Sequence, residues 1–114
     1  MESQDHTAIF AKDLDTGAVT QLTDGSAIAA SPDVYGNVVV WLDWRNCADP
    51  QNQNIMDCAE VYGHNLATGV EVRITYLPDR AKQTARIWSN HLFVDMKTTS
   101  GNAIFMIDLP AELE

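Results

Sequence analysis

A short pattern that occurs three times restricts the fold of this chain more than any other feature of its sequence. The three copies span residues 9–14, 61–66 and 104–109, and each begins with an aliphatic residue followed by an aromatic one. The first two copies continue into Thr-Gly and then into a short strand-like run that ends in Thr. They lie 52 residues apart, and recurrence at such a distance is typical of repeat proteins built from one supersecondary unit.

The same shift of 52 residues relates the rest of the first unit to the second. With this shift, the apolar run 38–43 aligns with 91–95, and Trp41 aligns with Phe93. Both runs are rich in β-branched and aromatic residues and are too short for a helix, so each is predicted to be a buried strand. Trp41 and Phe93 are therefore expected at equivalent packing positions.

The step from the second copy to the third is shorter. Leu66 and Leu109 are only 43 residues apart, and the difference is close to the length of a turn-rich segment bounded by Cys47 and Cys58. We therefore predict a unit of about 43 residues, with an insertion at 46–58 in one unit.

Each unit is predicted to contain four short strands. The first strand is expected at 27–33 and 84–88, the second at 38–43 and 91–95, the third at 8–14, 60–66 and 103–109, and the fourth at 18–23 and 70–75. No segment has the sustained periodicity and the capping residues of a helix. The chain is therefore predicted to be all-β.

An antiparallel four-stranded unit of this length is typical of a β-propeller blade. Several motifs resemble the TolB-type propeller repeat, also called the WD40-like or PD40 repeat. They are Ile-Phe-x-x-Asp-Leu-x-Thr-Gly at 9–17, Ser-Pro-Asp at 31–33 and the strand ending in Trp-x-Asp at 41–43. The segment 39–46 is similar to propellers of bacterial and archaeal cell-surface proteins.

The order of the predicted strands implies blades of unequal completeness. We expect one propeller segment over 1–114, with a complete blade at 27–75 and partial blades at 8–23 and 84–109. Propellers close with roughly four to eight blades, so the chain is expected to belong to a larger ring. The remaining blades would come from the same chain or from other copies.

Charge and composition narrow the classes of partner. The net charge of −9 would repel phosphate backbones, so nucleic acid is not expected to bind. No apolar run approaches the length of a membrane span. The acidic start at 1–6 also lacks the basic and then apolar opening of a signal peptide.

Cys47 and Cys58 flank a segment rich in Asn, Asp, Gln and Pro, which predicts a loop between two strands. A disulfide across it would stabilise the fold by about 3 kcal/mol. It would also indicate an oxidising location, namely extracellular, cell surface or periplasmic. The alternative is two free thiols in the cytosol. Structural zinc is not expected, because no second cysteine pair supplies the remaining ligands.

Trp44 and Arg45, at the mouth of the insertion, are the first candidates for a binding contact. Aromatic residues and arginine are enriched at binding hot spots, and an exposed Trp44 would suit stacking on sugar rings. Alternatively, Trp44 covers the core while Arg45 stacks on a neighbour or pairs with Asp43.

Further candidates within the insertion carry oxygen atoms of the kind that calcium prefers. They are Asp49, Asn52, Asn54 and Asp57. Solvated turn residues are the alternative, and no Asp-x-Asp-x-Asp-Gly pattern is present, so we predict neither a metal nor a cofactor. Asp13 is expected to form local hydrogen bonds in its hairpin turn.

No pattern in the sequence points to catalysis. The histidines are scattered, and nucleophile-elbow, P-loop and Rossmann motifs are absent. We therefore expect a non-catalytic propeller segment that binds a protein or a polysaccharide as part of a secreted or cell-surface protein. One alternative is the propeller of an enzyme, which resemblance to prolyl-oligopeptidase-like peptidases or polysaccharide lyases would imply, with catalytic residues outside this chain. A purely structural spacer is another.

Overall fold

The computed structural model describes residues 8–52, 57–77 and 80–114. Within these ranges the chain forms nine strands and one short 3-10 helix, and no α-helix occurs among the described residues. The prediction of an all-β fold is confirmed. The elements are β1 (Phe10–Lys12), β2 (Val19–Gln21), β3 (Ala29–Tyr35), β4 (Val38–Asp43), β5 (Glu60–Asn65), β6 (Glu71–Arg73), β7 (Lys82–Trp88), β8 (His91–Thr98), β9 (Gly101–Asp108) and η1 (Ala111–Leu113).

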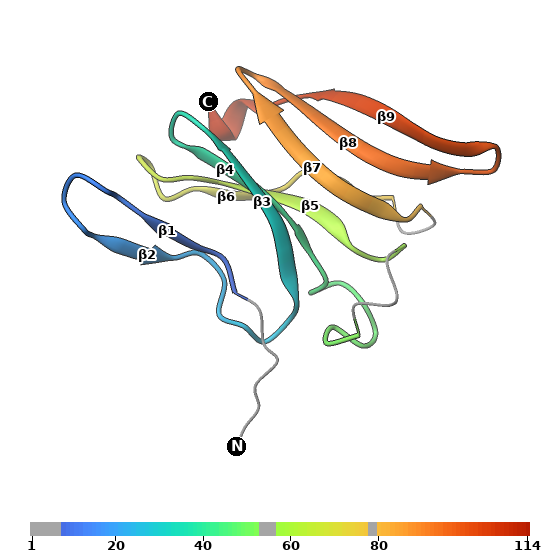
Figure 1. Cartoon of the computed structure of the whole chain (residues 1–114), viewed down its shortest axis with the longest axis horizontal. Coiled ribbons are helices and arrows are strands. Elements are labelled where there is room, and N and C mark those ends of the chain that lie inside the picture. The colour runs from blue at the N-terminus through green and yellow to red at the C-terminus, as the bar shows by residue number, and fades with distance from the viewer. Residues whose placement is uncertain (1–7, 53–56, 78–79) are drawn as a thin grey trace.

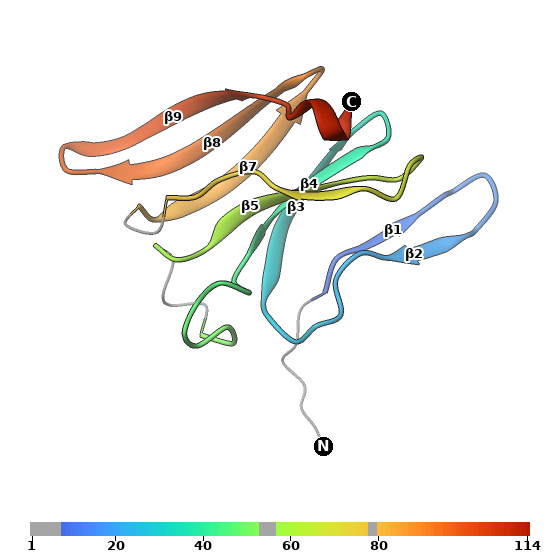
Figure 2. The same ribbon diagram turned by 180° about the vertical axis from the view of Figure 1, so that it is seen from behind.

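The described strands form three antiparallel sheets, in which neighbours in sequence are neighbours in space. They contain two, four and three strands, in the orders β1-β2, β3-β4-β5-β6 and β7-β8-β9. The sequence predicted the same division of strands. The four-stranded sheet lies between the other two (Figures 1 and 2), and none of the three sheets closes on itself within the described part of the chain. No helix with the length and hydropathy needed to cross a bilayer is found among the described residues.

Strand β4 is buried on both faces, because the central sheet is covered from both sides. Its residues alternate between two apolar cores, as the pleat of a strand requires. Toward β7 and β8 they are Val38, Val40 and Leu42, and toward β1 and β2 they are Val39 and Trp41. Burial on both faces explains why β4 is a continuous apolar run instead of an alternating one.

One position of the repeat shows how burial depends on the neighbouring sheet. Ile9 and Val61 occupy this position in the first two sheets and are 5% and 0% exposed. Ile104 occupies it in the third sheet, yet it is 73% exposed. The first two side chains face a following sheet, and Ile104 faces outward from β9. The outer face of the third sheet therefore presents apolar residues that are buried elsewhere in the repeat.

Strands β4 and β8 are related by 53 residues, not by the 52 that the sequence suggested. The turns before them match at Gly36 and Ser89, whose φ angles are +59° and +57°. Trp41 is opposite Tyr62, whereas Val94 is opposite the equivalent aromatic residue of β9, Phe105. The predicted equivalence of Trp41 and Phe93 is wrong, because a slip of one residue moves a side chain to the other face.

The repeated Thr at the end of the fourth strand has a structural role. The Thr23 hydroxyl accepts a hydrogen bond from the Ile9 amide, and the Thr75 hydroxyl accepts one from the Val61 amide, both at 2.9 Å. Each threonine therefore fixes the start of the third strand in its own unit.

The hairpin turns after the third strands are also built alike. The Asp13 carboxylate accepts hydrogen bonds from the amides of Asp15 and Thr16, at 2.8 and 3.3 Å, as predicted. The Asn65 side chain does the same in the second unit. The glycines that follow, Gly17 and Gly69, both have φ of +79°, which residues with a side chain rarely adopt.

Candidate functional site

The cysteine loop, residues 44–59 between β4 and β5, is closed by a disulfide. Cys47 and Cys58 are bonded, with their Cα atoms 5.3 Å apart, so the predicted disulfide is confirmed. The described part of the loop comprises 44–52 and 57–59, and Asn54, one of the predicted contacts, lies outside the described residues.

Hydrogen bonds attach the cysteine loop to the segment that connects the first two sheets. The Pro50 carbonyl accepts a bond of 2.9 Å from the Ile28 amide. The Gln51 side-chain amide donates to the carbonyl oxygens of Ser26 and Gly25, at 2.7 and 3.2 Å. The described part of the loop is thus attached to the fold both at its disulfide and at Pro50 and Gln51.

Trp44 is part of the core and does not form an exposed platform. Its side chain is 4% exposed and packs in the same core as Cys47, and its amide donates to the Ile28 carbonyl at 2.9 Å. Of the two arrangements considered for Trp44, the exposed one is therefore excluded. The chain turns inward directly after β4, so the indole covers the end of the core, which was the alternative arrangement.

Arg45 is held by two carboxylates and an aromatic ring. Its guanidinium lies 2.8 Å from Asp43 and 2.9 Å from Glu71, and 4.0 Å from the centre of the Tyr62 ring. The hydrogen bond with Asp43 raises the pKa of Arg45 above its usual value. The alternative in which Arg45 pairs with Asp43 is therefore the observed one. A hollow of about 290 Å³ beside it is lined by Asp24, Ser26, Asp43, Arg45 and Glu71, among others.

The other predicted contacts are spread along the cysteine loop. Asp49 is exposed, and its carbonyl accepts a bond of 3.1 Å from the amide of half-buried Asn52. Asp57 is exposed, and its carbonyl accepts a bond of 2.9 Å from the Lys82 ammonium. Within 8–52, 57–77 and 80–114, no group of three or more His, Cys, Asp or Glu residues is placed to hold a metal ion.

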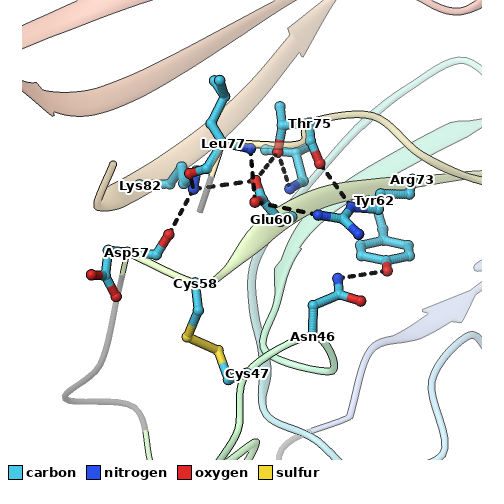
Figure 3. A network of polar contacts seen from close by, with 11 residues as sticks. Asn46, Cys47, Asp57, Cys58, Glu60, Tyr62, Arg73, Thr75, Leu77 and Lys82 are labelled. Atoms are coloured by element: carbon cyan, nitrogen blue, oxygen red, sulfur yellow. Dashed lines mark hydrogen bonds and ion pairs between the residues drawn. A yellow bond between two sulfur atoms is a disulfide. The ribbon is translucent and has the colours of Figure 1, made fainter. Parts of the chain in front are cut away.

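A buried ion pair beneath the cysteine loop was not predicted (Figure 3). The Lys82 ammonium of β7 lies 3.2 Å from the Glu60 carboxylate of β5, and both side chains are fully buried. Glu60 also accepts hydrogen bonds from the Thr75 hydroxyl, at 2.6 Å, and from the Leu77 amide, at 2.8 Å. Lys82 donates to the carbonyl oxygens of Asp57 and Leu77. The pair thus links the second and third sheets to the base of the loop.

The environment of Lys82 opposes its charge. Burial lowers the pKa of Lys82, and Glu60 acts in the opposite direction. Neither residue belongs to a recognisable sequence motif. In the sequence, each is only a charged residue at the start of a strand, and charged residues are usually placed at the surface.

A second concave surface runs between the first sheet and the central sheet. This groove, with a volume of about 780 Å³, follows the unpaired edge of β1 and the end of β3. Its lining includes Phe10, Lys12, Asp13, Asp33, Val34 and Leu66. Apolar and charged side chains therefore share the surface.

Comparison of the sequence with models of known protein families gives no match. A search of curated proteins also finds no match. The function has to be argued from the arrangement of the residues described above.

Proposed function

We propose that the chain is a segment of a β-propeller that acts as a non-catalytic scaffold for binding a protein or a polysaccharide, in a secreted or cell-surface protein. The main support is the face-to-face stack of three antiparallel sheets, in which Ile9 and Val61 are buried by the next sheet and Ile104 is not. Blades of a propeller bury their apolar faces by this kind of stacking.

The proposal requires further blades, and two features support this requirement. The outer faces of the first and third sheets carry Phe10 (58% exposed), Ile104 (73%) and Met106 (63%). Large apolar side chains that share one exposed face, as Ile104 and Met106 do on β9, often mark an interaction site. The second feature is the groove along β1, where the described part of the chain places no strand beside β1 other than β2.

The cysteine loop is our candidate for the contact with the partner. It is pre-organised by the disulfide and by the bonds of Pro50 and Gln51, and a rigid loop loses little conformational entropy on binding. Asp49, Asn52 and Asp57 supply polar groups at its surface. Trp44 supports the loop from the core instead of touching the partner.

The binding function can be tested on the full chain with soluble polysaccharides and with extracellular proteins of the source organism. We expect saturable binding to at least one of these classes. Asp49→Ala/Asn52→Ala should weaken a contact made by the loop at least about tenfold without changing the melting temperature. A chain that captures neither class would contradict the proposal.

The propeller architecture needs a separate measurement. We expect a structure of the complete natural protein to show a closed ring in which further sheets cover Phe10 and Ile104. A complete protein that leaves both side chains in solvent would contradict it.

A further inference from the structure

Two adjacent hairpin turns present the same three-residue motif. Tyr35-Gly36-Asn37 joins β3 to β4, and Trp88-Ser89-Asn90 joins β7 to β8. Gly36 and Ser89 share a left-handed backbone conformation, with φ of +59° and +57°. A serine in this conformation is uncommon, so the turn geometry is kept even where glycine is absent. Both turns lie at the end of the molecule opposite the cysteine loop (Figures 1 and 2).

The aromatic residues of the two motifs meet across the boundary between the sheets. The centres of the Tyr35 and Trp88 rings are 5.0 Å apart, and the ring planes are inclined by 65°. Trp88 is 68% exposed and Tyr35 is 40% exposed. Tyr35 keeps this exposure although the third sheet covers its cross-strand partner, Val38. A further blade over the third sheet would therefore leave Trp88 accessible too.

The surroundings of the pair combine an aromatic face with polar turn residues, which suits a neutral sugar better than an anionic ligand. An aromatic face stacks on the C–H side of a pyranose ring, while the exposed Asn37, Ser89 and Asn90 offer donors and acceptors to its hydroxyl groups. The net charge of −9 disfavours anionic ligands. We propose that Tyr35, Trp88 and their turn residues, the Tyr35–Trp88 site, bind a neutral oligosaccharide or polysaccharide.

A purely structural role for the pair is the competing explanation. The second and third sheets are already joined by a buried core and by the Glu60–Lys82 ion pair. Moreover, the Asp33 carboxylate accepts a bond of 2.9 Å from the Ile87 amide across the same boundary. An additional contact between two exposed rings is therefore not required to join these sheets. The site rests on the binding function proposed above and gives it a ligand class and a location.

The tryptophans of this chain make a direct test possible. Trp41 is 0% exposed and Trp44 is 4% exposed, so iodide quenching of tryptophan fluorescence reports mainly on Trp88. The full chain would be titrated with cellohexaose, laminarihexaose, mannohexaose and maltohexaose, and binding would be measured by calorimetry. We expect at least one hexasaccharide to bind and to protect the fluorescence from iodide.

Variants of the two rings locate the binding site. Trp88→Ala and Tyr35→Ala should each weaken binding of that hexasaccharide at least about tenfold, and Trp88→Phe, which keeps an aromatic face, should weaken it only about threefold. Tyr76→Ala is the matched control, because Tyr76 is also an exposed aromatic residue, at 66%, but lies outside the site. A melting temperature of Trp88→Ala equal to that of the unaltered chain excludes unfolding as the cause of its loss of binding.

Three results would overturn the sugar site. The first is that none of the four hexasaccharides binds. The second is that Tyr76→Ala weakens hexasaccharide binding as much as Trp88→Ala does. The third is that binding survives in Trp88→Ala but is lost in Asp49→Ala/Asn52→Ala. The third result would uphold the proposed binding function and move its contact to the cysteine loop. Protein binding without sugar binding would likewise keep the function and reject the site.

Discussion

Glu60 and Lys82 show how single residues hold this fold together. Each side chain is fully buried, so neither charge is hydrated by water, and an unpaired charge there would be strongly destabilising. Their mutual attraction and the four partners Thr75, Leu77, Arg73 and Asp57 compensate for that lost hydration. Removing one of the two charges is therefore expected to lower the free energy of unfolding by more than the intact pair adds to it.

Lys82→Met is expected to destabilise the protein by about 3–5 kcal/mol, because it leaves the buried Glu60 carboxylate with the more distant, partly exposed Arg73 as its remaining cation. Lys82→Met/Glu60→Gln should recover part of this loss, since no buried charge remains. Urea unfolding measures both changes. Lys97→Met is the control, because Lys97 is an exposed lysine on the neighbouring strand, β8. This variant should change the free energy of unfolding of the protein by less than about 0.5 kcal/mol. A similar loss in both single variants would contradict the role of the ion pair.

Residue-level expectations succeeded where the partners are close in sequence. The hydrogen bonds of Asp13 and the pairing of Arg45 with Asp43 are local, and both were among the arrangements considered from the sequence. The partnership of Glu60 with Lys82 spans 22 positions and two sheets, and no spacing rule encodes it. The sequence left both an exposed and a buried Trp44 open, because hydropathy does not reveal the direction in which a chain turns after a strand.

Among the elements, the cysteine loop combines an insertion with a firm attachment. It interrupts the hairpin between β4 and β5, yet it is joined to the rest by the disulfide, by Pro50 and Gln51, and at its base by the carbonyl of Asp57. An insertion that adds so many contacts stabilises the sheet it interrupts. The loop also buries Trp44 in the core.

Cys47→Ser/Cys58→Ser is expected to lower the free energy of unfolding by about 3 kcal/mol, because the disulfide closes a loop of 11 residues in the unfolded chain. Thermal unfolding of the variant measures the change. Treating the wild-type protein with a thiol reductant should lower its stability by a similar amount and leave the double variant unaffected. An unchanged melting temperature in both experiments would show that the attachments at Pro50 and Gln51 are sufficient.

At the scale of the whole molecule, the three sheets form a stack in which the described residues leave the two outer faces uncovered. Among the described sheets, only the central one is covered on both sides, and β4 is the one described strand in which every residue is buried. Because the three sheets are copies of one repeat, each is expected to have two apolar faces like those of the central sheet. The chain therefore presents surfaces at both ends of the stack that match surfaces buried in its middle.

Val61→Ser and Ile104→Ser compare one repeat position in its covered and uncovered forms. In the isolated chain, Val61→Ser should lower the free energy of unfolding by about 3 kcal/mol, because it removes buried apolar volume and buries a hydroxyl group. Ile104→Ser should change stability by less than about 0.5 kcal/mol. Urea unfolding distinguishes these values, and light scattering checks that the chain is monomeric. Equal costs in a monomer would refute the idea that only a neighbouring sheet buries this position.

Sequence alone determined the number and order of the strands, the turns with their Asp, Asn, Thr and Gly residues, and the disulfide. These features follow from local periodicity and turn chemistry, which act over a few residues. Tertiary structure decided the face on which Phe93 lies, the burial of Trp44, the pairing of Glu60 with Lys82 and the meeting of Tyr35 with Trp88. Each of these depends on how one sheet packs against the next, and a one-residue slip is enough to reverse a face.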